Sequence, residues 1–439
     1  MDRSKLRNHQ FLLSYTLLVL ASIAVYFPIL KNALLKYWDD QWVVMNGYTS
    51  GGMTASNLKD IMLDYYEGQY APFNEYLYLT LYSINGYDPF IFHLASLTIH
   101  LVNSILVMVV IKNLMESTLK FDPDFIRWVS FIAAFIFCVH PVNVESVAWM
   151  SASKILVYGL FYLLATITFL KYLKTKKRAY YILTLVLFAC SFLGKEQAVT
   201  FPVWLLLIYW ILNYDLRSKS VWMSVLPFFA LSIYFGIITI YSQYPGGDGF
   251  LSAQTNYPLW QRIIFGCYAF LEYGFKTLLP FHLSYLYPFP VQVGEKLPTW
   301  LMIYPILIIV LFISFRKSLV SLKPLTAGLA FFAIHIAIAL HVIPLSRFVI
   351  IADRYAYLAI IGLAGILAYY LVLTLRSINS TFYRALLLSV TVLFVSYLGV
   401  YAHKRTYVWQ TTDTLKKEIR GLLKQRNDYM KPKAKIPSK

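Results

Sequence analysis

Two adjacent carboxylates, Asp39 and Asp40, lie between Trp38 and Trp42, a few residues after a long apolar run. A carboxylate is able to take a proton from a hydroxyl group, so the pair is a candidate general base. Because adjacent carboxylates repel each other, we expect one of them to have a raised pKa or a cationic partner. Two plainer interpretations stay open: Asp39 only caps a short helix that begins at Gln41, or the pair binds a divalent metal. No complete set of metal ligands is visible, so no metal site is assigned.

Further ionisable residues lie where other apolar runs end. They are His140 and Glu145 in HPVNVES, Lys195 and Glu196 in GKEQAVTFP, and Arg347, Asp353 and Arg354 in SRFVIIADRY. Ionisable groups at membrane depth are costly, so they usually face a cavity or each other. The cations suit a phosphate group, which an arginine binds with two parallel hydrogen bonds. Taken singly, each of these residues also fits a simple ion pair between sequence neighbours.

Two histidines, His93 and His100, are seven residues apart in another apolar run and therefore share one face of a helix. They are candidates for substrate binding. Packing or hydrogen bonding between helices is the favoured interpretation, because polar side chains inside membranes commonly join neighbouring helices.

The composition indicates which elements must position these groups. Of the 439 residues, 59% are hydrophobic and only 14% are charged, and the mean hydropathy is +0.59, which is typical of a polytopic membrane protein. Apolar runs of this length must be helical in a bilayer, and the alternation of a barrel strand is missing. The predicted fold is therefore all-α. The expected helices fall at roughly 11–30, 90–111, 127–147, 155–173, 179–194, 198–213, 221–242, 299–315, 324–345, 355–375 and 384–402.

The basic residues predict the orientation of these helices. Five Lys and Arg residues fall within 171–178, so this loop is expected to be cytoplasmic by the positive-inside rule. Residues 31–89 then form a long extracytoplasmic first loop that carries the acidic pair. The segment 260–280 has one polar stripe and favours an interfacial or re-entrant helix within a second outer loop, 243–298. The chain then has eleven spanning helices, or twelve if 260–280 also crosses.

The predicted organisation is a transmembrane domain, 1–402, followed by a basic amphipathic tail, 403–439. The formal net charge of +18 is spread over loops and tail with no nucleic-acid-binding motif. Anionic membrane lipids are therefore the expected partners of this charge, and nucleic acid is not. The protein is expected in the cell membrane if bacterial and in the endoplasmic reticulum if eukaryotic.

The order of motifs resembles the polytopic glycosyltransferases of the GT-C type, and specifically the membrane half of the transmembrane and tetratricopeptide-repeat O-mannosyltransferases. The matching stretches, in order from residue 37 to 415, are DDQWVVMN, QYAPFNEYLYLTLYSINGYDPFIFHLASLTIHLVN, HPVNVES, GKEQAVTFP, PFHLSYLYP, ADRYAYL and RTYVWQTTDTL. Each motif alone is weak, whereas the series is more specific.

The resemblance implies transfer of a sugar from a polyprenyl-phosphate-linked donor to an acceptor hydroxyl on a protein or glycan. Transfer would occur on the extracytoplasmic face, with inversion at the anomeric carbon. Asp39 or Asp40 would be the general base, and Glu145 would orient the acceptor. Arg354, with Lys195 and Arg347, would hold the leaving phosphate. In-line attack places base and phosphate on opposite faces of the sugar.

The sequence departs from that family in two places. Where the family has a Gly-Arg-Ala-Asp segment, the stretch MSASKILV has Ser153 and Lys154. No tetratricopeptide repeat occurs in the 439 residues, so acceptor binding by such repeats is not expected. Three rival functions stay open: a transporter or flippase of lipid-linked glycans, an O-antigen ligase or polymerase, and a membrane scaffold that presents the first loop.

Overall fold

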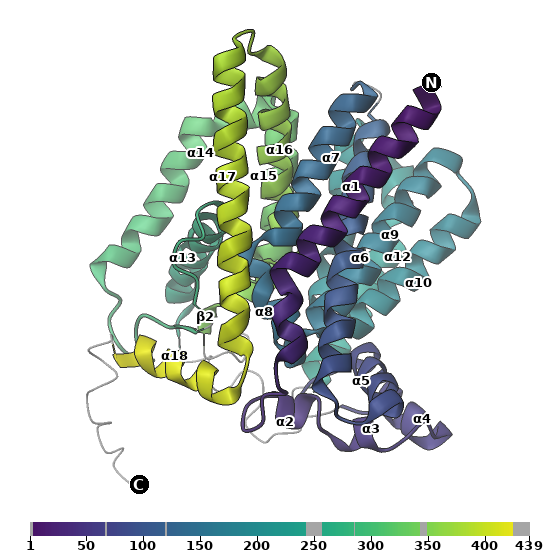
Figure 1. Ribbon diagram of the computed structural model, residues 1–439, viewed down its shortest axis with the longest axis vertical. Coiled ribbons are helices and arrows are strands. Elements are labelled where there is room, and N and C mark those ends of the chain that lie inside the picture. Colours follow the sequence, from purple (N-terminus) through teal and green to yellow (C-terminus); the bar gives the residue numbers. More distant parts are fainter. Residues whose placement is uncertain are drawn as a thin grey trace.

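The structure is a computed structural model that describes residues 3–65, 68–118, 121–242, 257–284, 286–342 and 349–424. It is a bundle of long helices that run roughly along one direction (Figure 1). These helices are α1 (Arg3–Tyr26), α6 (Pro89–Glu116), α7 (Pro123–Val139), α9 (Lys154–Thr175), α10 (Arg178–Gly194), α11 (Phe201–Ile211), α12 (Lys219–Ser242), α14 (Ile303–Ser321), α15 (Lys323–Ile336), α16 (Ile360–Ser377) and α17 (Thr381–Thr406).

Shorter elements connect the long helices. They are η1 (Phe27–Lys31), α2 (Asp40–Val43), α3 (Gly47–Ser50), α4 (Ala55–Leu63), α5 (Pro72–Asn85), η2 (Pro141–Asn143), α8 (Val144–Ala148), η3 (Met150–Ala152), η4 (Glu196–Thr200), α13 (Leu259–Leu278), η5 (Thr299–Met302), η6 (Ala337–Leu340), η7 (Asp353–Ala356), η8 (Tyr407–Trp409) and α18 (Thr412–Lys424). The strands β1 (Tyr287–Pro288) and β2 (Val349–Ile351) form one small antiparallel pair. The prediction of an all-α polytopic membrane protein is confirmed.

Local sequence signals explain where several helices begin. Asp88 accepts a hydrogen bond from the backbone N–H of Phe90 at the start of α6, and Asp122 caps α7 in the same way. A proline follows each of these caps, at a position where its missing N–H would have no partner within the helix. The helices therefore begin at the polar residue that ends each connection.

Within the described ranges, eight helical segments are long and apolar enough to cross a membrane, and the bent pair of α7 and α8 makes a ninth. Two shorter apolar helical segments, Arg178–Gly194 and Glu196–Ile211, complete a set that coincides with the eleven predicted runs. The set does not include α13, which contains Arg262, Glu272 and Lys276. Glu272 and Lys276 form an ion pair, with their N and O atoms 2.8 Å apart.

The first loop and the C-terminal segment lie at the same end of the bundle (Figure 1). The backbone N–H of Ala33 donates to the carbonyl of Gln410 over 2.9 Å, and Thr412 Oγ1 donates to the carbonyl of Lys36 over 2.6 Å. The N-terminus lies at the opposite end of the bundle. An odd number of membrane crossings between the N-terminus and the C-terminal segment requires this arrangement. The helix that leads into the tail continues to Thr406, so the predicted boundary at residue 403 falls inside α17.

A large apolar core joins α1, α6, α7, α9, α10, α11 and α16. Close approach of α15 and α16 depends on two glycines: a Cβ on Gly362 would lie 2.3 Å from the carbonyl oxygen of Gly328. In contrast, α14 buries none of its side chains within the protein. Its apolar surface is suited to contact with lipid.

Candidate active site

The candidate site is built around residues 140–154, which join α7 to α9 at the end of the bundle that carries the first loop (Figure 1). Pro141 cannot donate a backbone hydrogen bond, so α7 ends at Val139 and the chain turns by 48° into α8. His140 caps the turn, because its Nδ1 accepts from the N–H of Val142. The turn directs Glu145 into the protein, where its side chain is fully buried.

Glu145 binds Arg354 of η7 through both of its carboxylate oxygens. Arg354 Nη1 lies 2.5 Å from Oε1, and the backbone N–H of Arg354 donates to Oε2 over 2.9 Å. The guanidinium also lies over the rings of Trp149 and Tyr355, at 5.3 and 4.9 Å from their centroids. These contacts hold Arg354 in one orientation while leaving 19% of its side chain exposed. Part of the Arg354 side chain therefore remains in contact with solvent.

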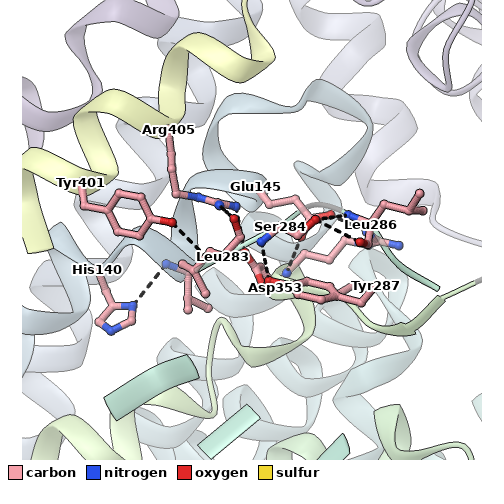
Figure 2. Close-up of polar contacts among 12 residues, drawn as sticks. His140, Glu145, Leu283, Ser284, Leu286, Tyr287, Asp353, Tyr401 and Arg405 are labelled. Atoms are coloured by element: carbon pink, nitrogen blue, oxygen red, sulfur yellow. Dashed lines mark hydrogen bonds and ion pairs between the residues drawn. The ribbon is translucent and has the colours of Figure 1, made fainter. Parts of the chain in front are cut away.

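Asp353, the neighbour of Arg354, has a different partner. Arg405 Nη2 of α17 lies 2.9 Å from Asp353 Oδ2, and the hydroxyl of Tyr287 donates to Oδ1 over 2.9 Å. Arg405 also donates to the carbonyl of Leu283, as Figure 2 shows beside the Asp353 contact. The interpretation that Asp353 and Arg354 pair as sequence neighbours is therefore wrong. Both are held by residues from elsewhere in the chain.

Lys195 and Glu196 form an ion pair of neighbours, with Nζ and Oε1 3.1 Å apart. Gly194 ends α10 against the backbone of Tyr158, where a Cβ would lie only 2.9 Å from the Tyr158 nitrogen. Lys195 is almost fully buried, and its ammonium lies 5.7 Å from the centroid of the Tyr355 ring. Because Arg354 lies over the same ring, the structure brings these two predicted phosphate-binding cations together.

Asp40 is buried and accepts three hydrogen bonds. The donors are the backbone N–H of Leu35 and both the backbone N–H and the hydroxyl of Ser151. Burial raises the pKa of Asp40 to about 6, although these hydrogen bonds favour the charged form. Asp40 thus fastens α2, and with it the start of the first loop, to η3.

Asp39 is half-buried and differs from its neighbour in every contact. It occupies the N-cap position of α2, but its side chain accepts no capping hydrogen bond. The helix begins at Asp40 rather than Gln41, so the interpretation of Asp39 as a side-chain cap is wrong. Among the described residues, the carboxylate of Asp39 has no hydrogen bond or ion pair. It is the member of the pair that is free to meet a ligand.

A small cavity of about 20 Å³, which has room for about one water molecule, lies between the first loop and the start of α9. Its lining residues are Trp42, Val43, Tyr48, Ile61, Asp64, Gln69, Ala71, Pro72, Asn74, Glu75 and Lys154. Glu75 accepts a hydrogen bond from Asn46 over 3.0 Å, and burial raises its pKa to about 7. Trp42 and Val43 of α2 line the cavity, whereas neither Asp39 nor Asp40 does.

The histidines are engaged in the packing of the helices. His100 bonds to the hydroxyl of Tyr357 over 2.9 Å and to the carbonyl of Cys138 over 3.1 Å, as the interpretation of hydrogen bonding between helices predicts. His140 bonds to the carbonyl of Thr277 over 2.9 Å. His93 is also buried. The exposed part of the site contains none of the three.

Arg347 lies outside the described residues. Within the described ranges, no three His, Cys, Asp or Glu side chains are grouped in an arrangement that could hold a metal ion.

Reasoning from the sequence missed the roles of Ser151, Lys154 and Arg405. Arg405 had a signal in the sequence, because it opens the Arg-x-x-x-Trp motif that ends at Trp409. Ser151 had none.

Comparison with known proteins was made at the level of sequence. No protein-family model matches the chain. "Protein O-mannosyl-transferase Tmtc1" of Drosophila melanogaster is 26% identical over 178 residues, which are 38% of this chain and 19% of that protein. "Protein O-mannosyl-transferase Tmtc2" of the same organism is 26% identical over 215 residues, 45% of this chain and 22% of that protein. The matches span about a fifth of the length of these relatives. The predicted resemblance is thereby confirmed as a distant similarity.

Proposed function

We propose that this protein is a membrane glycosyltransferase that moves a sugar from a polyprenyl-phosphate-linked donor to an acceptor hydroxyl. The observation that carries the proposal is that Asp39, a carboxylate without a partner among the described residues, lies at the same end of a membrane bundle as the cations Arg354 and Lys195. The similarity to two proteins named O-mannosyl-transferases supports mannose as the sugar and a protein hydroxyl as the acceptor.

In the proposed reaction, Asp39 accepts the proton of the acceptor hydroxyl. The hydroxyl oxygen then forms a bond to the anomeric carbon of the sugar, and the bond from that carbon to the phosphate oxygen breaks. The electron pair leaves with the lipid phosphate, whose negative charge Arg354 and Lys195 stabilise. Attack opposite the leaving group inverts the anomeric centre.

The neighbouring acids have positioning roles in this proposal. Asp40 fastens α2, so that Asp39 stays at the end of the bundle. Glu145 keeps the guanidinium of Arg354 in one orientation. The basic loop after α9 lies at the end of the bundle opposite to the first loop. By the positive-inside rule this basic loop is cytoplasmic, so the end with the first loop is the extracytoplasmic face. Transfer on that face requires donors whose sugar already lies on the extracytoplasmic side of the membrane.

The test uses the purified full-length protein in detergent. It is incubated with a panel of polyprenyl-phosphate-linked sugars and with acceptor peptides that contain Ser and Thr, and transferred sugar is measured by mass spectrometry. We expect transfer or slow hydrolysis of at least one donor, and loss of both in Asp39→Asn. Failure of every phosphate-linked donor, together with movement of intact lipid-linked glycans between leaflets in liposomes, would favour a flippase instead.

A further inference from the structure

The turn between α11 and α12, residues 212–218, lies on the side of the membrane opposite to the candidate active site. It contacts the basic loop after α9, because the ammonium group of Lys176 lies 5.4 Å from the centroid of the Tyr214 ring. That loop is expected to be cytoplasmic by the positive-inside rule. The turn and the start of α12 therefore lie at the cytoplasmic surface of the membrane.

An open groove of about 370 Å³ lies where this turn leads into α12, and we call it the α12 groove. Its lining residues are Arg217, Lys219, Trp222, Met223 and Leu226. One water molecule needs only about 10–15 Å³ of such volume, so the groove has room for a much larger group. It joins two cations at the membrane surface to three large apolar side chains of α12.

The positive charge of the groove has no counter-charge within the described part of the chain. Neither Arg217 nor Lys219 belongs to an ion pair among the described residues. Asp215 is the acid of the turn, and its Oδ1 accepts a hydrogen bond from the backbone N–H of Arg217 over 2.9 Å. A further cation reaches the turn from α15, since Lys323 Nζ donates to Asn213 Oδ1 over 2.6 Å. With the lysine of the basic loop, four cations and one carboxylate lie on or against this turn.

The apolar side of the groove continues along the whole of α12. Exposed apolar side chains recur at intervals of three, four and seven residues, which places them on one face of the helix. They are Met223, Leu226, Ile233, Ile237 and Ile240. In a bilayer such a face contacts the acyl chains of lipids.

Trp222 lies between the cations and this apolar face. Its Nε1–H donates to the carbonyl of Leu216 over 2.8 Å, while 47% of the residue stays exposed. Tryptophan commonly occurs at the level of the lipid headgroups, where its polar and apolar parts both find suitable surroundings. The order of cations, tryptophan and apolar face thus matches the order of phosphate, glycerol and acyl chains in a phospholipid.

We propose that the α12 groove binds one phospholipid with an anionic headgroup from the cytoplasmic leaflet. Its phosphate lies between Arg217 and Lys219, and its acyl chains follow the exposed face of α12. Arginine binds a phosphate with two parallel hydrogen bonds, and lysine adds a compact positive charge. The cationic group of a zwitterionic headgroup would be repelled by the same cations, so the groove should prefer an anionic lipid. This inference does not depend on the proposed sugar transfer.

The experiment measures which lipids stay bound to the full-length protein. The protein in detergent is equilibrated with an equal mixture of phosphatidylglycerol and phosphatidylcholine, and the retained lipids are identified by native mass spectrometry. The wild type should retain phosphatidylglycerol in preference. Arg217→Gln and Lys219→Gln should each lower this preference about fivefold, the factor that corresponds to the attraction of one surface cation for anionic lipid. Glycerol 3-phosphate, which has no acyl chains, should not displace the bound lipid.

The matched control is the double variant Arg316→Gln/Lys317→Gln. These two exposed residues lie near the end of α14, and α15, which follows, begins at Lys323 beside the same turn. The control therefore removes one arginine and one lysine at the same membrane surface, but outside the groove. It should keep the preference of the wild type, whereas Arg217→Gln/Lys219→Gln should lose most of it.

Three results would overturn the inference. An unchanged preference in Arg217→Gln/Lys219→Gln would show that the groove binds no anionic lipid. Equal losses in this variant and in the control would show a general attraction to the basic surface of the protein. Displacement of the lipid by glycerol 3-phosphate would show a site for a soluble anion. None of these results bears on the sugar-transfer assay, so the two proposals fail separately.

Discussion

The two adjacent carboxylates should respond very differently to replacement by asparagine. Asp39 is half-buried and has no side-chain partner among the described residues, whereas Asp40 is buried beneath three donors. Asp39→Asn should therefore abolish transfer without unfolding the protein. Asp40→Asn should destabilise the protein and reduce transfer only because α2 is displaced.

The magnitudes follow from the contacts of each carboxylate. An asparagine at position 40 keeps one acceptor oxygen and turns an amide NH₂ group toward at least one of the donors from Leu35 and Ser151. An unsatisfied buried donor costs about 1–3 kcal/mol, so the free energy of unfolding should fall by about that amount. Asp39→Asn breaks no described contact and should change stability by less than about 0.5 kcal/mol. Loss of a general base should lower the rate by about 10²–10⁴-fold.

The assay combines the midpoint of thermal unfolding in detergent with the rate of sugar transfer at saturating donor and acceptor. Asp60→Asn is the matched control, because Asp60 is a carboxylate of the same loop outside the site, and it should change neither quantity. The reasoning would be refuted if Asp39→Asn kept the full transfer rate. It would also fail if Asp40→Asn lost transfer without losing stability, since Asp40 would then be the base.

Other predictions concern the buried charges and the C-terminal segment. Glu145→Gln and Arg354→Gln should each lower the free energy of unfolding by about 3–5 kcal/mol. The double variant should lower it by less than the sum of the two single losses. Strictly additive losses in unfolding measurements would contradict the ion pair. Burial raises the pKa of Glu75 to about 7, so the folded state binds its proton more tightly than the unfolded state. Stability should thus fall as the pH rises from about 4.5 to about 7, and Glu75→Gln should lose that part of the pH dependence; identical pH profiles of the two proteins would contradict it. Trp409→Ala removes the ring that stacks on Trp149, with the two ring centroids 5.3 Å apart. Because Trp149 supports the guanidinium of Arg354, this variant should raise the KM for the donor. An unchanged KM together with a lower unfolding midpoint would limit Trp409 to a packing role.

Much of the fold could be predicted because the signals for it are local. The apolar runs, the capping residues Asp88 and Asp122, and the prolines that follow them locate the helices within a few residues. The polar stripe of the segment 260–280 predicts that α13 does not cross the membrane, and α13 is not among the candidate spans of the described residues, because three charged residues interrupt its apolar surface. Helix propensity, capping and hydropathy each depend on a short window of sequence.

The sequence predicted which residues belong to the candidate site, but not which of them contact each other. The sequence showed that Asp39, Asp40, Lys195 and Arg354 are ionisable groups at the ends of apolar runs. It did not show which acid is free, because that depends on Ser151, a residue 111 positions from Asp40. A serine in an apolar stretch has no feature that distinguishes a hydrogen-bond donor to a distant carboxylate from an ordinary packing residue.

The sequence by itself determined that the chain is a helical membrane protein with acids and cations near the ends of its helices. Only the tertiary structure decided that Glu145 holds Arg354 across 209 positions, that Arg405 holds Asp353, and that Lys154 has an amide as its partner. The physical reason is that burial and charge pairing depend on distances in space. Hydropathy and capping act between residues that are close along the chain, and they carry no information about such distances.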